Sequence, residues 1–271
     1  MTTAGTEVLR GLNDALRAAP AELPIGIPDR AAAEVRLASG IPALTGEPLL
    51  TWDGLVGTAS LIAEALSATE AGQAAAVAIE RLVHRSAGLD HEEITAAALA
   101  GAWDAVPGLA GALELDPDTL LTVLDFAARP ALRAGAAALA PVLAACVWSR
   151  GHCPACGAPP ALSVIRGKEN ERRLHCGRCG TSWVYARVRC PTCGERDHEH
   201  LGLLHAAGEG AYRRAEVCDR CGCYVKSVTL LDAPDAGRLL ELDLETAALD
   251  FMAIEAGYGR RALTGGEWES S

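Results

Sequence analysis

Lysine and long apolar runs are both scarce in this chain of 271 residues. Only Lys168 and Lys226 are lysines among the 24 basic residues, and the heavy use of Ala and Gly indicates that this bias reflects genome composition, so we attach no function to it. No apolar run approaches the roughly 20 residues that a membrane-spanning helix needs. The first segment, MTTAGTEVLRGLNDALRAAP, predicts an amphipathic helix with acidic residues and does not resemble a signal peptide. We therefore expect a cytoplasmic protein without membrane insertion.

Alternation of β-branched residues is nearly absent before residue 160, so residues 1–149 are predicted to form a helical bundle or a layered helical domain. Asp29 and the pair Asp116-Pro117 suit the first residues of helices. Pro130 and Pro141 are expected to kink or split the last long segment, because proline removes a backbone donor. The expected helices are Glu7–Ala19, Ala31–Ser39, Leu55–Ser67, Ala71–Ser86, His91–Asp104 and Thr119–Val147.

The character of the sequence changes twice after this region. From Arg150 it consists of short predicted strands, glycine-containing turns and cysteine pairs, and after about Asp232 it is helical again, with a helix predicted over Asp243–Gly257. The predicted fold class is therefore α+β. The predicted parts are an all-α domain over 1–149, a first Cys₄ module over 150–187, a second over 188–231, and a C-terminal helix and tail over 232–271.

The net charge of −11 is distributed unevenly along the chain. Residues 1–149 carry eight basic and eighteen acidic side chains, residues 150–227 carry thirteen and eight, and residues 228–271 carry three and nine. Eight thiolates around two divalent cations would bring the middle region close to neutral. A basic footprint for nucleic acid is therefore not evident, and we expect no nucleic-acid partner.

Cysteines are concentrated in one region: nine of the ten lie between Cys153 and Cys223. In a reducing compartment they favour metal ligands or redox groups over disulfides. Eight form C-x-x-C pairs, each followed by a glycine that permits the positive φ of a metal-binding turn. Four such turns predict metal binding strongly. The pairs are Cys153/Cys156 in CPACG, Cys176/Cys179 in CGRCG, Cys190/Cys193 in CPTCG and Cys218/Cys221 in CDRCG.

The segment between the second and third pairs decides how the pairs combine. Thr181–Arg189, TSWVYARVR, alternates aromatic and β-branched residues and predicts a strand. Ten extended residues cover about 33 Å, whereas the ligands of one tetrahedral metal lie within about 4 Å of each other. The second and third pairs therefore belong to different metals.

A tandem repeat supplies the remaining partners. CPAC, nineteen residues and CGRCG-TSWV correspond to CPTC, twenty-four residues and CDRCG-CYV. We infer two rubredoxin-like or zinc-ribbon modules with one metal each. The predicted ligands are Cys153, Cys156, Cys176 and Cys179 in the first site, and Cys190, Cys193, Cys218 and Cys221 in the second.

A closed Cys₄ site has no open coordination position, so hydrolysis by a Lewis-acid metal is not expected, and no catalytic residue is predicted. A structural metal that supplies folding free energy is the simplest interpretation. Thiolate ligands suit both zinc and iron, and iron would permit one-electron chemistry. The sequences CPAC and CPTC also resemble thioredoxin-type oxidoreductases, which require a βαβ frame that this sequence lacks.

Other cysteines and histidines are interpreted as outside the metal sites. Cys146 is predicted to be a core residue, and Cys223 a strand residue that points away from the metal, although it offers an alternative ligand or redox partner. His152 and His175 adjoin ligating cysteines whose sets are already complete. The remaining histidines are expected in solvated loops or at helix ends: His84, His91, His198, His200 and His205.

Several motifs together resemble the FdhE family, the accessory proteins for assembly of formate dehydrogenases. They are CPACGAPP, RRLHCGRCGTSWVYARVRCPTCG, EVCDRCGCYVKSV and LETAALDFMAIEAGYG, within residues 150–260. The resemblance implies a helical domain followed by paired rubredoxin-like modules that bind iron. It also implies contact with the catalytic subunit of a twin-arginine-exported, molybdenum- or tungsten-containing formate dehydrogenase. The family does not usually have a cysteine at the position of Cys223.

The expected function is therefore that of a maturation factor and not of an enzyme. The acidic excess of residues 1–149 favours a basic partner segment for the helical domain. Two other classes remain open. A tandem zinc-ribbon nucleic-acid binder would need exposed stacking residues, for which Trp183, Tyr185 and Arg187 are the best candidates. A thiol or iron redox protein would need a labile cysteine pair.

Overall fold

The structure is a computed structural model that describes residues 26–65, 70–85, 88–101, 106–205, 212–232, 234 and 236–260. The chain forms two compact units, one that includes residues 44–141 and one that includes residues 34–43 and the described residues of 142–260. The helix expected over Glu7–Ala19 lies outside the described residues. The four-part division of the chain stays a prediction.

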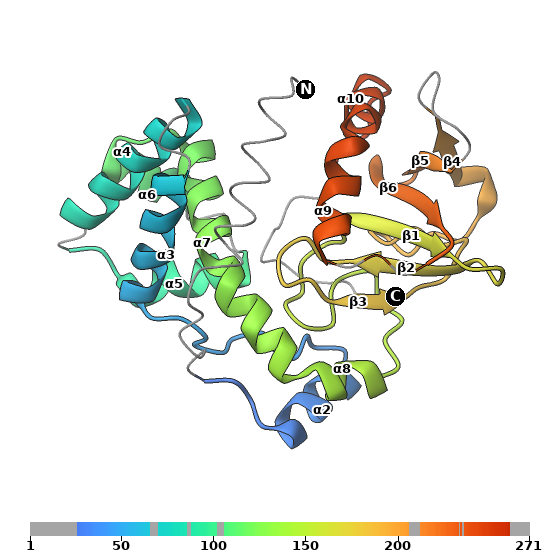
Figure 1. The fold of residues 1–271 in the computed structure, drawn as a ribbon, viewed down its shortest axis with the longest axis horizontal. Coiled ribbons are helices and arrows are strands. Elements are labelled where there is room, and N and C mark those ends of the chain that lie inside the picture. Colours follow the sequence, from blue (N-terminus) through green and yellow to red (C-terminus); the bar gives the residue numbers. More distant parts are fainter. Residues whose placement is uncertain are drawn as a thin grey trace. The chain divides into compact units, whose positions relative to one another are not determined.

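The first unit is helical, as predicted, and is organised around its longest helix (Figure 1). This helix, α7, packs against the four helices directly before it, α3 to α6, and its buried face includes Leu120, Leu124 and Leu132. Helix α6 was not predicted, because its sequence VPGLAGAL contains a proline and two glycines, which are weak helix formers. The helices are α3 (Trp52–Ala65), α4 (Glu70–His84), α5 (His91–Ala100), α6 (Val106–Leu113) and α7 (Pro117–Ala138).

Helix ends in the N-terminal half follow the capping residues of the sequence. Asp29 precedes α2 (Arg30–Ala38) and accepts a hydrogen bond from the Ala32 amide at 2.8 Å, and Asp116 accepts one from the Thr119 amide at 2.8 Å. Helix α7 continues through Pro130, and the division falls at Leu139, before α8 (Ala140–Ala145). Pro141 therefore lies where the helix divides, in the first turn of α8. Its missing amide costs no helical hydrogen bond there.

The second unit contains one six-stranded sheet in the order β3-β2-β1-β6-β5-β4. Each cysteine module supplies three consecutive antiparallel strands, and β6 of the second module pairs in parallel with β1 of the first. The two modules therefore lie side by side and share a sheet. The strands are β1 (Leu162–Arg166), β2 (Glu171–His175), β3 (Ser182–Val184), β4 (Leu201–Leu204), β5 (Arg213–Cys218) and β6 (Cys223–Leu230).

Two C-terminal helices, α9 (Ala236–Glu245) and α10 (Ala247–Glu255), pack against one face of this sheet (Figure 1). Leu242 of α9 packs on residues of β1 and β6, and Leu249 and Ala253 of α10 pack on residues of β5 and β6. The apolar residues of the predicted C-terminal helix thus complete the core of the second unit.

The prediction of one continuous helix over Asp243–Gly257 is wrong in its start and in its continuity. The helix begins at residue 236 and breaks at Thr246. The ammonium group of Lys226 donates a hydrogen bond to the Asp243 carbonyl at 2.6 Å, and the Thr246 hydroxyl donates to the same carbonyl at 3.2 Å. These donors satisfy the carbonyl that a continuous helix would bond to the amide four residues later.

The strand predicted over Thr181–Arg189 is also too long, because β3 ends at Val184. After Tyr185 the chain leaves the edge of the sheet and contacts the guanidinium of Arg172, which donates to the carbonyls of Ala186 at 2.8 Å and Arg189 at 2.9 Å. Side chains alternate along β2, so Arg172 lies on the face opposite to α9 and α10. The connection between the modules therefore runs across that second face.

Candidate metal centres

All four C-x-x-C pairs form the same turn. The amide of the glycine after the second cysteine donates to the carbonyl of the first cysteine, at distances between 2.9 and 3.2 Å. These glycines have φ between +64° and +80°, a region that residues with a Cβ rarely adopt. They are Gly157, Gly180, Gly194 and Gly222. The sequence C-x-x-C-G thus specifies a turn that directs both sulfurs to one side.

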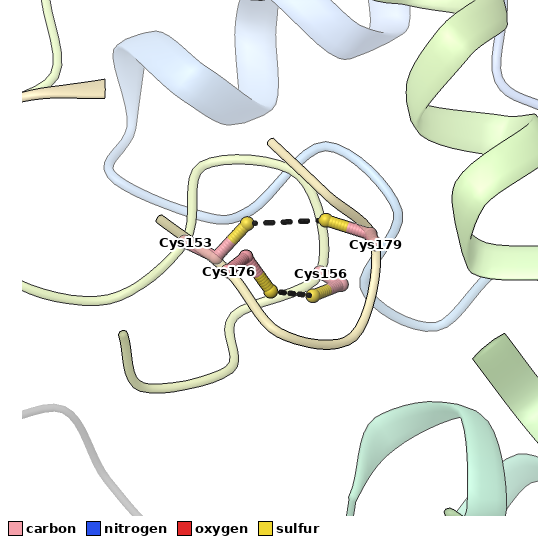
Figure 2. Close-up of side chains that lie close together, drawn as sticks. All are labelled: Cys153, Cys156, Cys176 and Cys179. Carbon is pink, nitrogen blue, oxygen red and sulfur yellow. Dashed lines mark hydrogen bonds between the residues drawn. The ribbon is translucent and has the colours of Figure 1, made fainter. Parts of the chain in front are cut away.

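The first group of cysteines, here called site one, brings together Cys153, Cys156, Cys176 and Cys179 (Figure 2). The sulfurs of Cys153 and Cys179 are 3.5 Å apart, as are those of Cys156 and Cys176. A tetrahedral metal with metal–sulfur bonds of 2.3 Å separates its sulfurs by about 3.8 Å. All four residues are buried. The arrangement therefore fits a closed tetrahedral site.

The second group, here called site two, brings together Cys190, Cys193, Cys218 and Cys221. The Cys190 and Cys221 sulfurs are 3.7 Å apart, and the Cys193 and Cys218 sulfurs are also 3.7 Å apart. Cys190 and Cys218 are buried, Cys221 is half-buried and Cys193 is exposed. Site two thus has the same geometry as site one with greater access to solvent.

The pairing of turns is the one that the tandem repeat predicts. The first turn meets the second and the third meets the fourth, and within each group the candidate ligand atoms lie within 4.8 Å of one another. The connection between the second and third pairs is not the long strand that was expected, yet its course over the second face of the sheet still separates the two inner pairs. Both groups could hold a metal ion, and thiolate ligands suit iron and zinc alike.

The thiols in each site influence one another's ionisation. In site one, burial raises the pKa of Cys153 well above its usual range, while hydrogen bonds from the other three thiols hold the pKa of Cys176 well below it. In site two, the hydrogen bond from Cys221 lowers the pKa of Cys190 to about 5, and burial raises the pKa of Cys218 to about 11. One thiolate is favoured at the expense of its neighbours, and a divalent cation would stabilise all four.

The cysteines outside these groups do not join either of them. Cys223 at the start of β6 donates weakly to the Cys221 carbonyl at 3.5 Å. Cys146 is half-buried, with its thiol 3.3 Å from the Leu143 carbonyl, so its expected place in the core is only partly correct. Among the described residues, no third group of histidines, cysteines and carboxylates converges.

Histidines also remain outside the two groups. His152 and His175 are buried, and burial together with the charges of Arg173 and Arg166 lowers the pKa of His175 to about 4, so its ring is neutral. His91, expected in a solvated or capping role, stacks on Trp52 with ring centroids 4.2 Å apart. The other four are exposed, as expected: His84, His198, His200 and His205.

The aromatic residues considered for nucleic-acid stacking are not available for it. Trp183 and Tyr185 are 4% and 5% exposed. The Trp183 indole donates to the Arg150 carbonyl at 3.1 Å, and the Tyr185 hydroxyl donates to the Cys190 carbonyl at 3.0 Å. Both side chains therefore fix the segments next to the cysteine turns, and only Arg187 of the three candidates is exposed.

The fold and the two thiolate groups define a protein in which a helical unit accompanies tandem rubredoxin-like Cys₄ modules. Residues 152–187 match the family "FdhE, central domain", and residues 188–264 match "FdhE, C-terminal domain". Both matches agree with the resemblance of the chain's motifs to the FdhE family.

Related proteins show the same resemblance. A Pseudomonas aeruginosa protein named "Protein FdhE homolog" is 37% identical over 167 residues, which cover 59% of this chain and 53% of that protein. A Stutzerimonas stutzeri protein of the same name is 42% identical over 113 residues, 41% of this chain and 36% of the relative. The matched segments thus span about a third to a half of these relatives. The crystal structure of FdhE from Pseudomonas aeruginosa superposes with a TM-score of 0.61 at 27% identity, over 94% of this chain and 85% of that one.

Proposed function

We propose that this protein is an accessory protein for the assembly of formate dehydrogenase. In this proposal it binds the catalytic subunit of the dehydrogenase in the cytoplasm and carries one metal ion, iron or zinc, in each Cys₄ site. One observation supports it most directly. The segments that match the two FdhE domain families contain two complete sets of four convergent cysteines. No described helix is long and apolar enough to cross a membrane.

The two sites support a role in binding more than a role in catalysis. Four thiolates around one metal fill a tetrahedral coordination shell, so no position is left for a substrate. Each metal would cross-link two turns of the sheet and contribute its binding free energy to folding. The proposal therefore assigns all eight paired cysteines to metal binding and assigns no catalytic residue.

Affinity capture tests the proposed partner. The tagged full-length protein is recovered anaerobically from its native host with formate dehydrogenase induced, and the co-purifying proteins are identified by mass spectrometry. We expect the dehydrogenase catalytic subunit to co-purify, and we expect it to be lost from the double variant Cys190→Ser/Cys193→Ser. The control is Cys146→Ser, which removes a cysteine outside both sites and leaves capture intact.

The alternative outcomes are equally informative. Recovery of nucleic acid in place of the dehydrogenase would favour the zinc-ribbon alternative. Recovery of proteins joined through exchanged thiols would favour a redox protein. Either result, obtained with a folded and metal-loaded protein, would contradict the proposed role in assembly.

A further inference from the structure

The two metal centres differ in how far their sulfurs are shielded from solvent. The four cysteines of site one are between 0% and 7% exposed. In site two, Cys193 is exposed and Cys221 is half-buried. These two residues come from different turns, one from CPTCG and one from CDRCG. Solvent therefore reaches ligands on both halves of site two.

Contacts with the turns explain the shielding of site one. The Ala43 amide donates to the Pro154 carbonyl of the first turn at 2.8 Å. The ring of Pro42 lies 3.3 Å from the position that a Cβ on Gly157 would occupy. The segment 34–43, which belongs to the same compact unit as the sheet, thus closes over the first turn of site one.

Contacts at site two do not bury all of its cysteines. Gly151 packs against the Pro191 carbonyl so closely that a Cβ there would overlap it, and the Tyr258 hydroxyl donates to Asp219 at 2.5 Å. These contacts reach the backbone of the third turn and a side chain of the fourth. Cys193 nevertheless remains exposed.

We propose that site two is the exchangeable metal site of this protein and that site one retains its metal. This inference rests on the proposed ligation of metal by the eight cysteines. A competing ligand with oxygen, nitrogen or sulfur donors approaches the metal of site two from the side of Cys193. Its donor atom takes the coordination position of that sulfur, and the released thiolate takes up a proton from water. Cys221 is displaced next, because it is the other accessible ligand.

The physical reason is access. Ligand substitution at a full tetrahedral shell needs room for the incoming donor, and the protein around a metal site controls that room. At site one the incoming donor can enter only after the surrounding segments open, which adds the free energy of local opening to the barrier. At site two the exposed Cys193 requires no such opening.

Residue-specific thiol labelling tests the proposal on the unmodified full-length chain. The zinc-loaded protein is mixed with excess EDTA, pulses of N-ethylmaleimide are applied at successive times, and mass spectrometry measures the label on each cysteine. We expect labelling of the four site-two cysteines at least about tenfold faster than labelling of the four site-one cysteines. Zinc release is expected in two phases of one ion each. Cys146 provides the internal reference for labelling that does not depend on the chelator.

Equal rates at the two sites, or faster labelling at site one, would overturn the proposal. A protein that binds two zinc ions and releases them together would disprove the difference between the sites and leave metal ligation intact. A protein that never binds two zinc ions would instead disprove the proposed ligand sets. Protection of Cys193 for as long as Cys153 in the holoprotein would also exclude access through the exposed sulfur.

Discussion

Arg172 of β2 and Glu216 of β5 form a buried ion pair with 2.5 Å between guanidinium nitrogen and carboxylate oxygen. Their side chains are 1% and 16% exposed. Strands β1 and β6 lie between them in the sheet, so the pair joins the first cysteine module to the second. The same guanidinium binds the Ser163 hydroxyl at 3.1 Å and two carbonyls of the connection between the modules. One side chain thus holds both modules and the segment that links them.

Replacement of Arg172 by methionine is expected to lower the free energy of unfolding by about 3–5 kcal/mol, because Glu216 and two carbonyls lose their buried donor. Chemical denaturation of the metal-loaded protein measures the loss. The matched control Arg187→Met removes an exposed arginine of the same connection and should change stability by less than about 0.5 kcal/mol. Equal effects of the two substitutions would show that Arg172 does not hold the modules together.

A double variant separates the ion pair from the other contacts. Arg172→Met/Glu216→Met removes both buried charges, and buried pairs replaced by apolar side chains often recover stability. We expect the double variant to lose less than the sum of the two single variants, with an interaction energy of about 1–3 kcal/mol. Strict additivity in the same denaturation measurement would contradict a direct interaction.

Lys226→Met is expected to loosen the attachment of α9 and α10. The Lys226 ammonium lies 2.7 Å from carboxylate oxygens of both Asp243 and Asp250, and it is 1% exposed. Burial raises the pKa of Asp250, but the hydrogen bond from Lys226 and the charge of Arg260 outweigh it and hold that pKa below its usual value. We expect a loss of about 3 kcal/mol and faster hydrogen exchange in the helices.

The second lysine of the chain provides the control for this prediction. Lys168 lies exposed in the turn between β1 and β2, so Lys168→Met should leave both stability and exchange unchanged. If the amide hydrogens of α9 and α10 exchange at the same rate in Lys226→Met as in the parent, the buried ammonium does not determine how these helices are held.

His175 predicts a specific dependence of stability on pH. Its pKa is lowered from 6.5 to about 4 by burial and by neighbouring arginines, so between these values the unfolded chain binds a proton that the folded chain does not. The stability associated with the neutral ring is therefore complete above pH 6.5 and declines as pH falls toward 4, by up to about 3 kcal/mol.

The measurement compares the parent with His175→Leu over this pH range, since the protonation of the metal-binding thiolates is common to both proteins. We expect the leucine variant to gain stability relative to the parent as the pH falls. A constant difference from pH 7 to pH 4 would mean that the His175 ring titrates alike in both states.

Replacing the glycines of the metal-binding turns is predicted to destabilise the protein, because these glycines have positive φ. Gly180 has φ of +80° and open space around its Cβ position, so Gly180→Ala introduces strain without a clash. We expect a loss of about 1–2 kcal/mol. Gly57 in α3 also has open space but helical geometry, and Gly57→Ala should stabilise by up to about 1 kcal/mol. Thermal unfolding that shifts both variants in the same direction would contradict this explanation.

Local patterns in the sequence predicted the cysteine turns well because the requirements of each turn lie within five residues. The repeat of C-P-x-C-G and C-x-R-C-G also predicted which turns meet. The shared sheet was not predicted, because the parallel pairing of β1 with β6 joins residues that are 64 positions apart, Leu162 and Lys226. Local periodicity in the sequence contains no information about such a long-range pairing.

The errors have related causes. Thr181–Arg189 has the composition of a strand, but Arg172 binds the carbonyls of Ala186 and Arg189 and directs the chain across the sheet. Thr246 interrupts a pattern that is helical throughout, because Lys226 takes the Asp243 carbonyl. In both places a buried cation from another strand overrides local propensity. For the C-terminal helices the sequence did carry a signal, a lysine within the largely apolar strand CYVKSVTL, whereas the charged strand ERRLH around Arg172 gives no such signal.

Native mass spectrometry of the full-length protein, purified anaerobically with metal supplied, tests the central claim most directly. We predict two metal ions per chain in the parent, one in Cys153→Ser/Cys156→Ser, one in Cys190→Ser/Cys193→Ser, and none when all four substitutions are combined. Two ions in either double variant, or a single ion in the parent that both double variants lose, would contradict the assignment of two independent Cys₄ centres.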